Sequence, residues 1–557
     1  MYKQVYDPVA NSLGWSTVFA VLPLVTLFVL LGGLKVKAQW AALASLAVAI
    51  LVALIVYSMP VGQAFDSAAE GAVFGLFPIM WIVVNAIWIY NMTRESGHFA
   101  VLRRSFGRVS DDERIQAVLI AFCFGALLEA LAGFGTPVAI SAVMLIALGF
   151  QPIKAAAVGL VANTAPVAFG AIAVPITTLA SVTGMPEKDL GSMVGRQTPL
   201  LALVVPLILV AIVDGRRGIR QTWPAAVAGG LAFAIAQFAC SNYVSVELTD
   251  IVASLVSAGA VVALLRVWQP SEHLRAPEMA AGGRPAMAGG SVADSRFEQE
   301  AERRAETPDS RGTMLVAYAP YLIIIVVFAL AQISWLPFKD FLDHRTKQFG
   351  WPGLDILNGK GKAPTSETFK FNWANAAGTL LLLSGLLTIP VLRLTAARAA
   401  RTWVASIVQL RSAILTVAAV LSLAYVMNLS GQTITIGQWL AGAGAAFALL
   451  SPLLGWFGVA VTGSDTSSNS LFGALQVAAA HKANLSPTLM AAANSSGGVL
   501  GKMVSPQNLA IGAAAVGMAG QEGEIFRRVI GWSIILIVVM CVLVYLQSTS
   551  VLSWMVV

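Results

Sequence analysis

The sequence predicts an all-α polytopic membrane protein, with about 12–15 hydrophobic segments in two inverted-topology repeats that contain broken helices or re-entrant hairpins. Hydrophobic residues make up 57% of the 557 residues and charged residues only 11%, which is far from the composition of a soluble domain. Many apolar stretches reach about 20 residues, enough to cross a hydrocarbon core of ~30 Å. Similar interruptions rich in Gly, Pro and Asn occur at corresponding places in the two halves.

Uninterrupted apolar stretches are the clearest spans. They include Trp15–Leu34, Ala38–Tyr57, Pro224–Tyr243, Met314–Gln332 and Gly531–Leu546. Met1–Gly14 is polar and precedes a full-length span rather than a short apolar region, so no cleavable signal is expected. The three cysteines lie within apolar spans and have no paired spacing, which is evidence against a disulfide framework or a metal site.

Basic residues in the short loops predict the orientation in the membrane. The loop from Arg94 to Arg114 is the most basic, and we expect it in the cytoplasm together with the loops at Arg216–Arg220 and Arg393–Arg401. The N-terminus is then external. Because most Lys and Arg residues lie in such loops, the net charge of +7 reflects topology, and the expected surroundings are a lipid bilayer with no nucleic acid.

A change in composition divides the chain. Gln269–Arg311 is rich in Ala, Gly, Pro and mixed charges, which is typical of a flexible linker. The expected units are an N-terminal membrane repeat over 1–268, a flexible cytoplasmic linker over 269–313 and a C-terminal membrane repeat over 314–557.

The two sets of interruptions are similar in residue type and spacing. The first set is E-A-L-A-G-F-G-T-P (Glu129–Pro137), N-T-A-P (Asn163–Pro166) and Pro175, and the second is T-G-S-D-T-S-S-N (Thr462–Asn469), N-S-S-G (Asn494–Gly497) and Pro506. In both halves the Asn precedes the last Pro by twelve residues. Broken helices are tolerated in a bilayer only where the freed backbone lines a cavity or meets protein partners. Paired breaks of this kind point to the binding site of a secondary transporter.

The orientation of the broken segments predicts the inverted repeat. Gln116–Phe134 starts from the cytoplasmic basic loop, whereas Gly437–Trp456 starts one span after another such loop and so begins outside. Each is the fourth hydrophobic segment of its half. Equivalent motifs that enter from opposite faces are expected for alternating access around a site at the membrane midplane.

Two carboxylates are candidates for proton coupling. Glu129 follows the apolar run F-C-F-G-A-L-L, and Asp465 lies among hydroxyl and amide groups between apolar segments. A carboxylate inside the membrane is costly when charged, which suits a group that binds and releases a proton. The alternatives are a structural acid at a broken helix for Glu129, and an ion ligand or a helix cap for Asp465.

Basic and polar residues are candidates for substrate binding. A guanidinium is a natural clamp for a carboxylate, but Arg411, with Tyr425 on a similar helix face, could also extend its side chain to the membrane surface. Lys502 lies near the second Asn motif and cannot reach the surface as easily, so it could bind the substrate or form a structural ion pair. The remaining candidates are expected where helices unwind and expose N–H groups that bind anions; they are Asn163, Thr164, Asn494, Ser495 and Ser496. A hydrogen bond between helices is the alternative for a single Asn, whereas the matching pair of Asn residues favours the site.

Motifs of other protein classes are missing from the sequence. The Gly-Lys pairs do not fit a phosphate-binding loop, and no HExxH zinc motif or haem signature occurs. The sequence therefore favours neither an enzyme nor a primary pump, and no cofactor is expected besides a proton as coupling ion.

The chain resembles the L-lactate permease family of bacterial transporters, which includes glycolate permeases. The shared segments are E-A-L-A-G-F-G-T-P-V-A-I (Glu129–Ile140), A-N-T-A-P-V-A-F-G (Ala162–Gly170), F-N-W (Phe371–Trp373), A-Y-V-M-N (Ala424–Asn428), T-G-S-D-T-S-S-N (Thr462–Asn469) and A-N-S-S-G-G-V-L-G-K-M-V-S-P-Q (Ala493–Gln507). Ala130 and Leu131 depart from the smaller residues usual in the family.

The resemblance implies proton-coupled uptake of lactate, and of glycolate, across the bacterial cytoplasmic (inner) membrane. In that reading Arg411 or Lys502 holds the carboxylate, Thr136 contacts the 2-hydroxyl group, and Glu129 or Asp465 carries the proton. The alternatives are a sodium-coupled transporter of another small carboxylate, and a channel or sensor without active transport. The preferred stereoisomer and the oligomeric state are left open.

Overall fold

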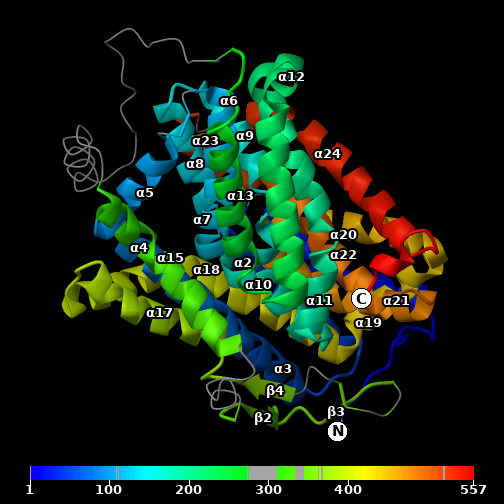
Figure 1. The fold of residues 1–557 in the computed structure, drawn as a ribbon. Coiled ribbons are helices and arrows are strands. Elements are labelled where there is room, and N and C mark those ends of the chain that lie inside the picture. Colours follow the sequence, from blue (N-terminus) through cyan, green and yellow to red (C-terminus); the bar gives the residue numbers. More distant parts are fainter. Residues whose placement is uncertain are drawn as a thin grey trace.

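The computed structural model describes residues 2–34, 36–107, 109–110, 112–133, 135–272, 274, 310–332, 344–359, 361, 363–364, 368–518 and 521–557. Helices account for most of these residues and strands for very few, which confirms the predicted all-α class (Figure 1). The predicted linker over 269–313 lies largely outside the described residues, so the division into three units stays a prediction.

The first half contains short helices around the interruptions and long helices outside them. Its helical elements are α1 (Leu13–Phe28), η1 (Val29–Gly33), α2 (Ala38–Ile55), α3 (Val61–Phe74), η2 (Gly75–Met80), α4 (Trp81–Glu95), α5 (His98–Gly107), α6 (Glu113–Gln116), η3 (Ala117–Phe124), α7 (Gly125–Ala132), α8 (Thr136–Ala147), α9 (Pro152–Ala162), η4 (Val167–Phe169), α10 (Gly170–Thr183), α11 (Glu187–Val194), α12 (Thr198–Tyr243) and α13 (Thr249–Leu265). Non-helical dihedral angles at Asp214 and Gly215 bend α12.

The second half has the same mixture of long and interrupted helices. Its helical elements are α15 (Arg311–Gln332), α17 (Ala377–Val391), α18 (Ala396–Ser430), α19 (Gln432–Leu440), η7 (Ala441–Ala446), α20 (Phe447–Thr462), α21 (Asp465–Ala483), α22 (Pro487–Gly501), η8 (Lys502–Val504), α23 (Pro506–Ala515), α24 (Glu522–Gln547) and η9 (Ser553–Met555). Gly444, whose φ is 56°, interrupts the predicted span Gly437–Trp456.

Apolar helices of membrane-spanning length dominate the described residues. Eight are long and apolar enough to cross a membrane, or nine if one bent pair counts as a span. That pair, Pro152–Ala162 with Val167–Thr183, bends by 64° at the first N-T-A-P break. Four shorter apolar helices add to them: Leu13–Phe28, Pro137–Ile146, Thr249–Leu265 and Ala377–Val391. These segments agree with the predicted range of about 12–15, whereas the inverted orientation of the repeats stays a prediction.

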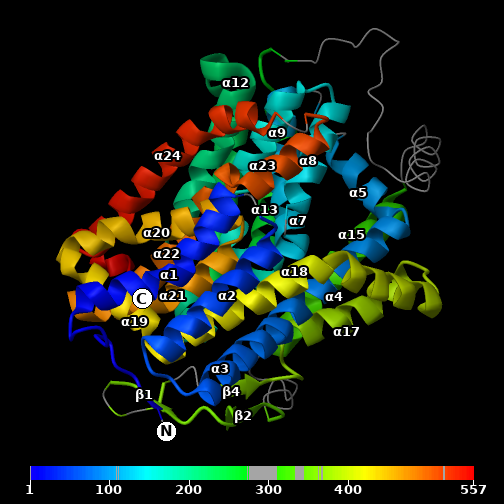
Figure 2. The ribbon, with the colours of Figure 1, turned by 180° about the vertical axis from the view of Figure 1, so that it is seen from behind.

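Helices that follow the breaks pack across the two halves. The first-half helix α10 contacts the second-half helix α21, and α8 contacts α23. Each of these four helices begins at a break, so these contacts bring the breaks of the two halves together. Figure 2 shows α8 beside α23. Helix starts that are 295 residues apart in the chain (Gly170 and Asp465) and 370 residues apart (Thr136 and Pro506) thereby belong to neighbouring helices.

Short strands at one end of the molecule were not predicted. β1 (Tyr2–Lys3) pairs in parallel with β3 (Ile356–Leu357), and β2 (Lys347–Gly350) pairs antiparallel with β4 (Thr368–Phe371). They lie beside the N-terminus, at the end of the molecule opposite the α12 bend (Figures 1 and 2). Strands of two to four residues are too short to show an alternating apolar pattern in the sequence.

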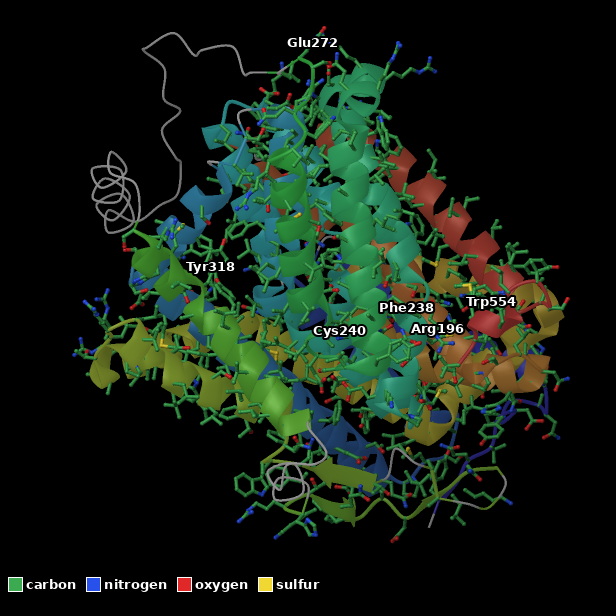
Figure 3. All side chains as sticks on the ribbon, in the orientation of Figure 1. Arg196, Phe238, Cys240, Glu272, Tyr318 and Trp554 are labelled. Carbon is green, nitrogen blue, oxygen red and sulfur yellow. The ribbon has the colours of Figure 1, made fainter. Side chains whose placement is uncertain are left out.

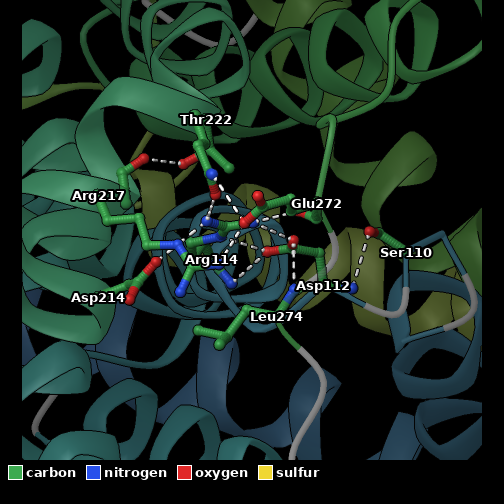
Figure 4. Close-up of polar contacts among 10 residues, drawn as sticks. Ser110, Asp112, Arg114, Asp214, Arg217, Thr222, Glu272 and Leu274 are labelled. Atoms are coloured by element: carbon green, nitrogen blue, oxygen red, sulfur yellow. Dashed lines mark hydrogen bonds and ion pairs between the residues drawn. The ribbon is translucent and has the colours of Figure 1, made fainter.

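At the end of the molecule near the α12 bend, a buried arginine hydrogen-bonds to several segments of the chain (Figure 4). Arg114 is 1% exposed and donates to Asp112 Oδ2 at 2.7 Å, to Asp214 at 3.1 Å and to the Glu272 carbonyl at 2.6 Å. Asp112 also accepts a bond from the Leu274 amide at 3.0 Å. Glu272 lies at the tip of the molecule (Figure 3). The chain that leaves α13 is therefore fastened to the start of α6 and to the bend of α12.

Candidate functional site

Glycines and capping residues produce the breaks that surround the site. Gly133 (φ 37°) ends α7 and Gly135 (φ 82°) precedes α8, while Gly463 (φ 76°) ends α20. Positive φ angles favour glycine because it lacks a β-carbon. Ser464 and Ser505 then cap α21 and α23 by accepting bonds from Ser467 N and Asn508 N.

The breaks enclose a cavity with a volume of about 50 Å³. The first half contributes Glu129, Gly133, Val167, Gly170, Ala171, Val174 and Pro175, and the second contributes Gly463, Ser464, Asp465, Thr466, Lys502, Gln507 and Asn508. Three of the described lining residues are ionisable: Glu129, Asp465 and Lys502. Gln507, which also lines the cavity, is exposed at the molecular surface.

A buried ion pair joins the two halves at this cavity. Lys502 Nζ donates to Glu129 Oε1 at 2.7 Å, and the two side chains are only 7% and 4% exposed. Asn163 Nδ2 donates to Glu129 Oε2 at 2.8 Å. A β-carbon at Gly170 would lie 2.7 Å from Glu129 Oε1, so only glycine allows this close approach. Opposite charge and hydrogen bonds together offset the cost of burying the pair.

Asp465 is a second buried carboxylate on the cavity wall. Its Oδ2 accepts a bond from Ser495 Oγ at 2.5 Å and one from Asn469 Nδ2 at 3.4 Å. Its Oδ1 has no hydrogen-bond partner among the described residues. Asp465 also interacts electrostatically with Lys502. The ammonium group of Lys502 therefore interacts with the carboxylates of both Glu129 and Asp465.

A chain of buried amides supports Asp465. Asn469 Nδ2 also donates to the Pro175 carbonyl of the first half at 3.1 Å. Asn494 Nδ2 donates to Asn469 Oδ1 at 2.9 Å, and Gln476 Nε2 donates to Asn494 Oδ1 at 3.1 Å. Each bond fixes the orientation of the next amide, so this network holds the first turn of α21 against α10.

The sequence matches one protein family over nearly its full length. The family described as L-lactate permease matches residues 16–551.

The chain belongs to the L-lactate permease family.

Individual relatives agree with this assignment. The chain is 40% identical to the L-lactate permease of Escherichia coli (strain K12), with 100% of both chains covered. It is 39% identical to Glycolate permease GlcA of the same organism, with 98% of each covered. A solved structure of Neisseria gonorrhoeae MtrF, described as one of a class of antimetabolite efflux pumps, overlaps with 87% of this chain and 83% of that one, at 15% identity and a TM-score of 0.46.

Four of the six segments that suggested the L-lactate permease family contribute to the cavity, whereas F-N-W and A-Y-V-M-N do not line it. Glu129 belongs to E-A-L-A-G-F-G-T-P, Asp465 to T-G-S-D-T-S-S-N, and Lys502 to the stretch that ends in K-M-V-S-P-Q. Asn163 and Ser495, both predicted site residues, bind the two carboxylates. Asn494 does not bind Asp465 directly but donates a hydrogen bond to Asn469, which in turn donates to Asp465.

Other predicted site residues lie elsewhere in the structure. Arg411 is exposed on α18, and Tyr425 is buried on the same helix with its hydroxyl 3.1 Å from Ser181 Oγ. Neither lines the cavity. Thr164 donates to the Val161 carbonyl at 2.7 Å, and buried Ser496 has no side-chain partner among the described residues. The Thr136 side chain lies outside the described part of the structure.

The predicted unwinding at the second Asn motif is wrong. Asn494, Ser495 and Ser496 lie inside the continuous helix α22, and the break begins only at Lys502. Asn163, in contrast, directly ends α9. The helix persists in the second half because it is held by close packing. Glycines at 497, 498 and 501 let α22 lie directly against the backbone of α20 and against Asp465.

Several residues of the site were missed from the sequence. Ser464, Thr466, Gln507 and Asn508 line the cavity, and each lies inside or beside a motif that had been recognised. Asp250 was also missed: it is fully buried in the first turn of α13, accepts a bond from Gln237 Nε2 at 2.9 Å and interacts electrostatically with Glu129. An acidic residue beside a long apolar stretch was the available signal.

Proposed function

We propose that the protein is a secondary active transporter that takes up lactate and glycolate together with a proton across the bacterial cytoplasmic (inner) membrane. The observation that carries the proposal is the buried Lys502 at the cavity, paired with Glu129. Membership of the L-lactate permease family and the names of its relatives support the substrate class. The protein would move its substrate without altering it chemically.

The cavity suits a small organic anion. Lys502 supplies a buried positive charge, and the first turns of α21 and α23 contribute lining residues from two helix N-termini. A helix N-terminus adds a partial positive charge and N–H donors. The hydroxyl groups of Ser464 and Thr466 and the amide of Asn508 provide partners for a 2-hydroxyl group.

Competition for Lys502 would couple the anion to a proton. With Glu129 and Asp465 both ionised, the lining already carries two negative charges against one positive charge. A substrate carboxylate that binds Lys502 displaces Glu129 and adds a third negative charge. Protonation of Glu129 relieves that repulsion while its hydrogen bond to Asn163 can remain. Substrate and proton therefore favour each other's binding.

This coupling also makes physical sense across an energised membrane. Moving one negative charge into a negative interior costs ~2.3 kcal/mol per 100 mV. A proton that travels with the monocarboxylate makes the step electroneutral.

Uptake of radiolabelled lactate into proteoliposomes tests the proposal. With an imposed pH gradient, acidic outside, we expect accumulation above equilibrium that a protonophore abolishes and that excess glycolate inhibits. Accumulation driven by a sodium gradient at equal pH on both sides would contradict the proton coupling. Absence of lactate binding by the folded protein would contradict the substrate.

A further inference from the structure

The two halves contribute chemically different walls to the cavity. The second half provides hydroxyl, amide and charged groups. The first half provides Glu129, two glycines and an apolar wall, which we define as Val167, Ala171, Val174 and Pro175. All four residues of the apolar wall are buried, so their cavity-facing atoms are available only to a molecule inside the cavity.

An unusual backbone conformation shapes the apolar wall. Ala171, Ile172 and Ala173 have φ angles of 45°, 58° and 58°, in the left-handed region that residues other than glycine rarely adopt. Ala171, the first residue of this turn, and Val174, which directly follows it, line the cavity, whereas Ile172 and Ala173 are buried and do not line it. Strained backbone of this kind persists where the surrounding structure requires it, and it is concentrated at functional sites.

The charges of the cavity limit the ligand to one carboxylate. Among the described lining residues Lys502 is the only basic side chain, and it faces two acidic ones. A second carboxylate on the ligand would meet Glu129, Asp465 or the apolar wall without a cation to pair with. The end of the ligand away from Lys502 must therefore be uncharged.

We propose that the apolar wall is the selectivity element of the carrier: it contacts the substituent on C2 of a 2-hydroxymonocarboxylate and limits that substituent to hydrogen or methyl. This inference rests on the proposed function and extends it to the residues that choose among substrates. Val174 is the central residue, because it is 1% exposed and lies in regular helix directly after the strained turn.

Variants with a smaller and a larger side chain at Val174 test this inference. Val174→Ala removes two carbon atoms from the wall, and Val174→Ile adds one. Competition against labelled lactate by glycolate, lactate and 2-hydroxybutyrate gives the apparent affinity of each acid. We expect Val174→Ala to raise the apparent affinity for 2-hydroxybutyrate relative to that for lactate about tenfold. Val174→Ile should raise the apparent affinity for glycolate relative to that for lactate by a similar factor. The reason is that one methylene in an apolar pocket changes selectivity by roughly 10- to 200-fold.

Val182→Ala is the matched control. Val182 is buried on the same helix α10, about two turns further on, and does not line the cavity. Val182→Ala should leave the ratios of the apparent affinities for the three acids as they are in the unaltered protein. Unchanged ratios in both Val174 variants, or equal changes in the Val174 and Val182 variants, would overturn the role of the wall. Failure of the unaltered protein to take up lactate would instead overturn the proposed function.

Discussion

In the proposed mechanism, both binding and coupling depend on Lys502. It is buried, it belongs to the second half, and its direct partner Glu129 belongs to the first. Removing one member of a buried ion pair leaves the other charge without compensation, which typically costs 3–5 kcal/mol. Substitutions at this pair should therefore keep a hydrogen-bonding group of similar size, so that the remaining partner still has a polar contact.

Glu129→Gln separates coupling from binding. The amide can still accept a bond from Lys502, but it cannot bind and release a proton. We expect uphill lactate uptake to be lost, while exchange of internal for external lactate at equal pH continues. Both activities are measured in the same proteoliposomes. Uphill accumulation by this variant would remove Glu129 from the coupling mechanism.

Lys502→Gln tests the anion site itself. Without the ammonium group the cavity keeps two carboxylates and no cation among its described lining residues, so lactate should bind at least tenfold more weakly. Both uptake and exchange should then fall. Lys482→Gln, at an exposed lysine of α21, is the control and should transport normally. Exchange at the unaltered rate in Lys502→Gln would show that another group holds the carboxylate.

The sequence predicted the ionisable residues of the site better than their partners. Glu129, Asp465 and Lys502 stand out because charge is rare in apolar segments. Arg411 stands out for the same reason, yet it is exposed. No local pattern says which face of a long helix is turned inward, since neighbouring helices decide that. Asn469 and Gln476 were missed because their role depends on contacts made by the fold.

At the scale of elements, the turn at the start of α10 stores strain. Left-handed dihedral angles cost roughly 1–2 kcal/mol for each residue with a β-carbon. Ala173 has such an angle, is buried and does not line the cavity. Ala173→Gly should therefore raise the thermal unfolding temperature in detergent and leave the lactate affinity unchanged, whereas Ala173→Val should lower that temperature. A less stable glycine variant would mean that the turn is not left-handed.

The network around Arg114 gives a second prediction, on pH. Burial acts to raise the pKa of Asp112, but hydrogen bonds from Arg114 and the Leu274 amide, with the Arg114 charge, outweigh it and lower the pKa below its ordinary value. The stability that this contributes is fully present above the ordinary Asp pKa of ~3.9 and is lost as the pH falls through the lowered value.

Thermal unfolding of the protein and of Asp112→Asn across pH tests this contribution. The variant should be less stable at pH 7, and the difference should shrink steadily as the medium is acidified below about pH 4. A difference independent of pH would mean that the carboxylate charge of Asp112 contributes nothing to this end of the molecule.

Helices were predicted well where the apolar pattern is long. They were predicted poorly where tertiary contacts decide whether a segment is helical or broken. The first break follows from Gly133, Gly135 and the N-T-A-P motif, whose residues disfavour helix locally. The second Asn motif has equally poor helix formers, but contact with α20 keeps α22 helical through Asn494. Propensity is a weak guide when a neighbouring helix packs this closely.

At the scale of the whole molecule, the cavity belongs to neither half alone. Its lining comes equally from both, and α10–α21 and α8–α23 contacts bring the halves together. The connecting stretch should therefore be dispensable once the protein has folded. A protease site inserted between residues 275 and 309 would allow the purified protein to be cut there.

We expect the two fragments to remain associated in detergent and to retain lactate uptake after reconstitution. Size-exclusion chromatography and the uptake assay measure these two properties. An uncut sample treated with inactivated protease is the control. Separation of the fragments would mean that the contacts across the cavity are too weak to hold the halves without a covalent link.

The small volume of the cavity has a consequence for water. A space of about 50 Å³ holds roughly three to five water molecules. A bound monocarboxylate would replace this water rather than share the space with it. The cavity of a loaded carrier would then hold no water through which protons could hop, so the protein should leak protons least when its substrate is bound. The tight interior would thereby protect the proton gradient that drives uptake in the proposed mechanism.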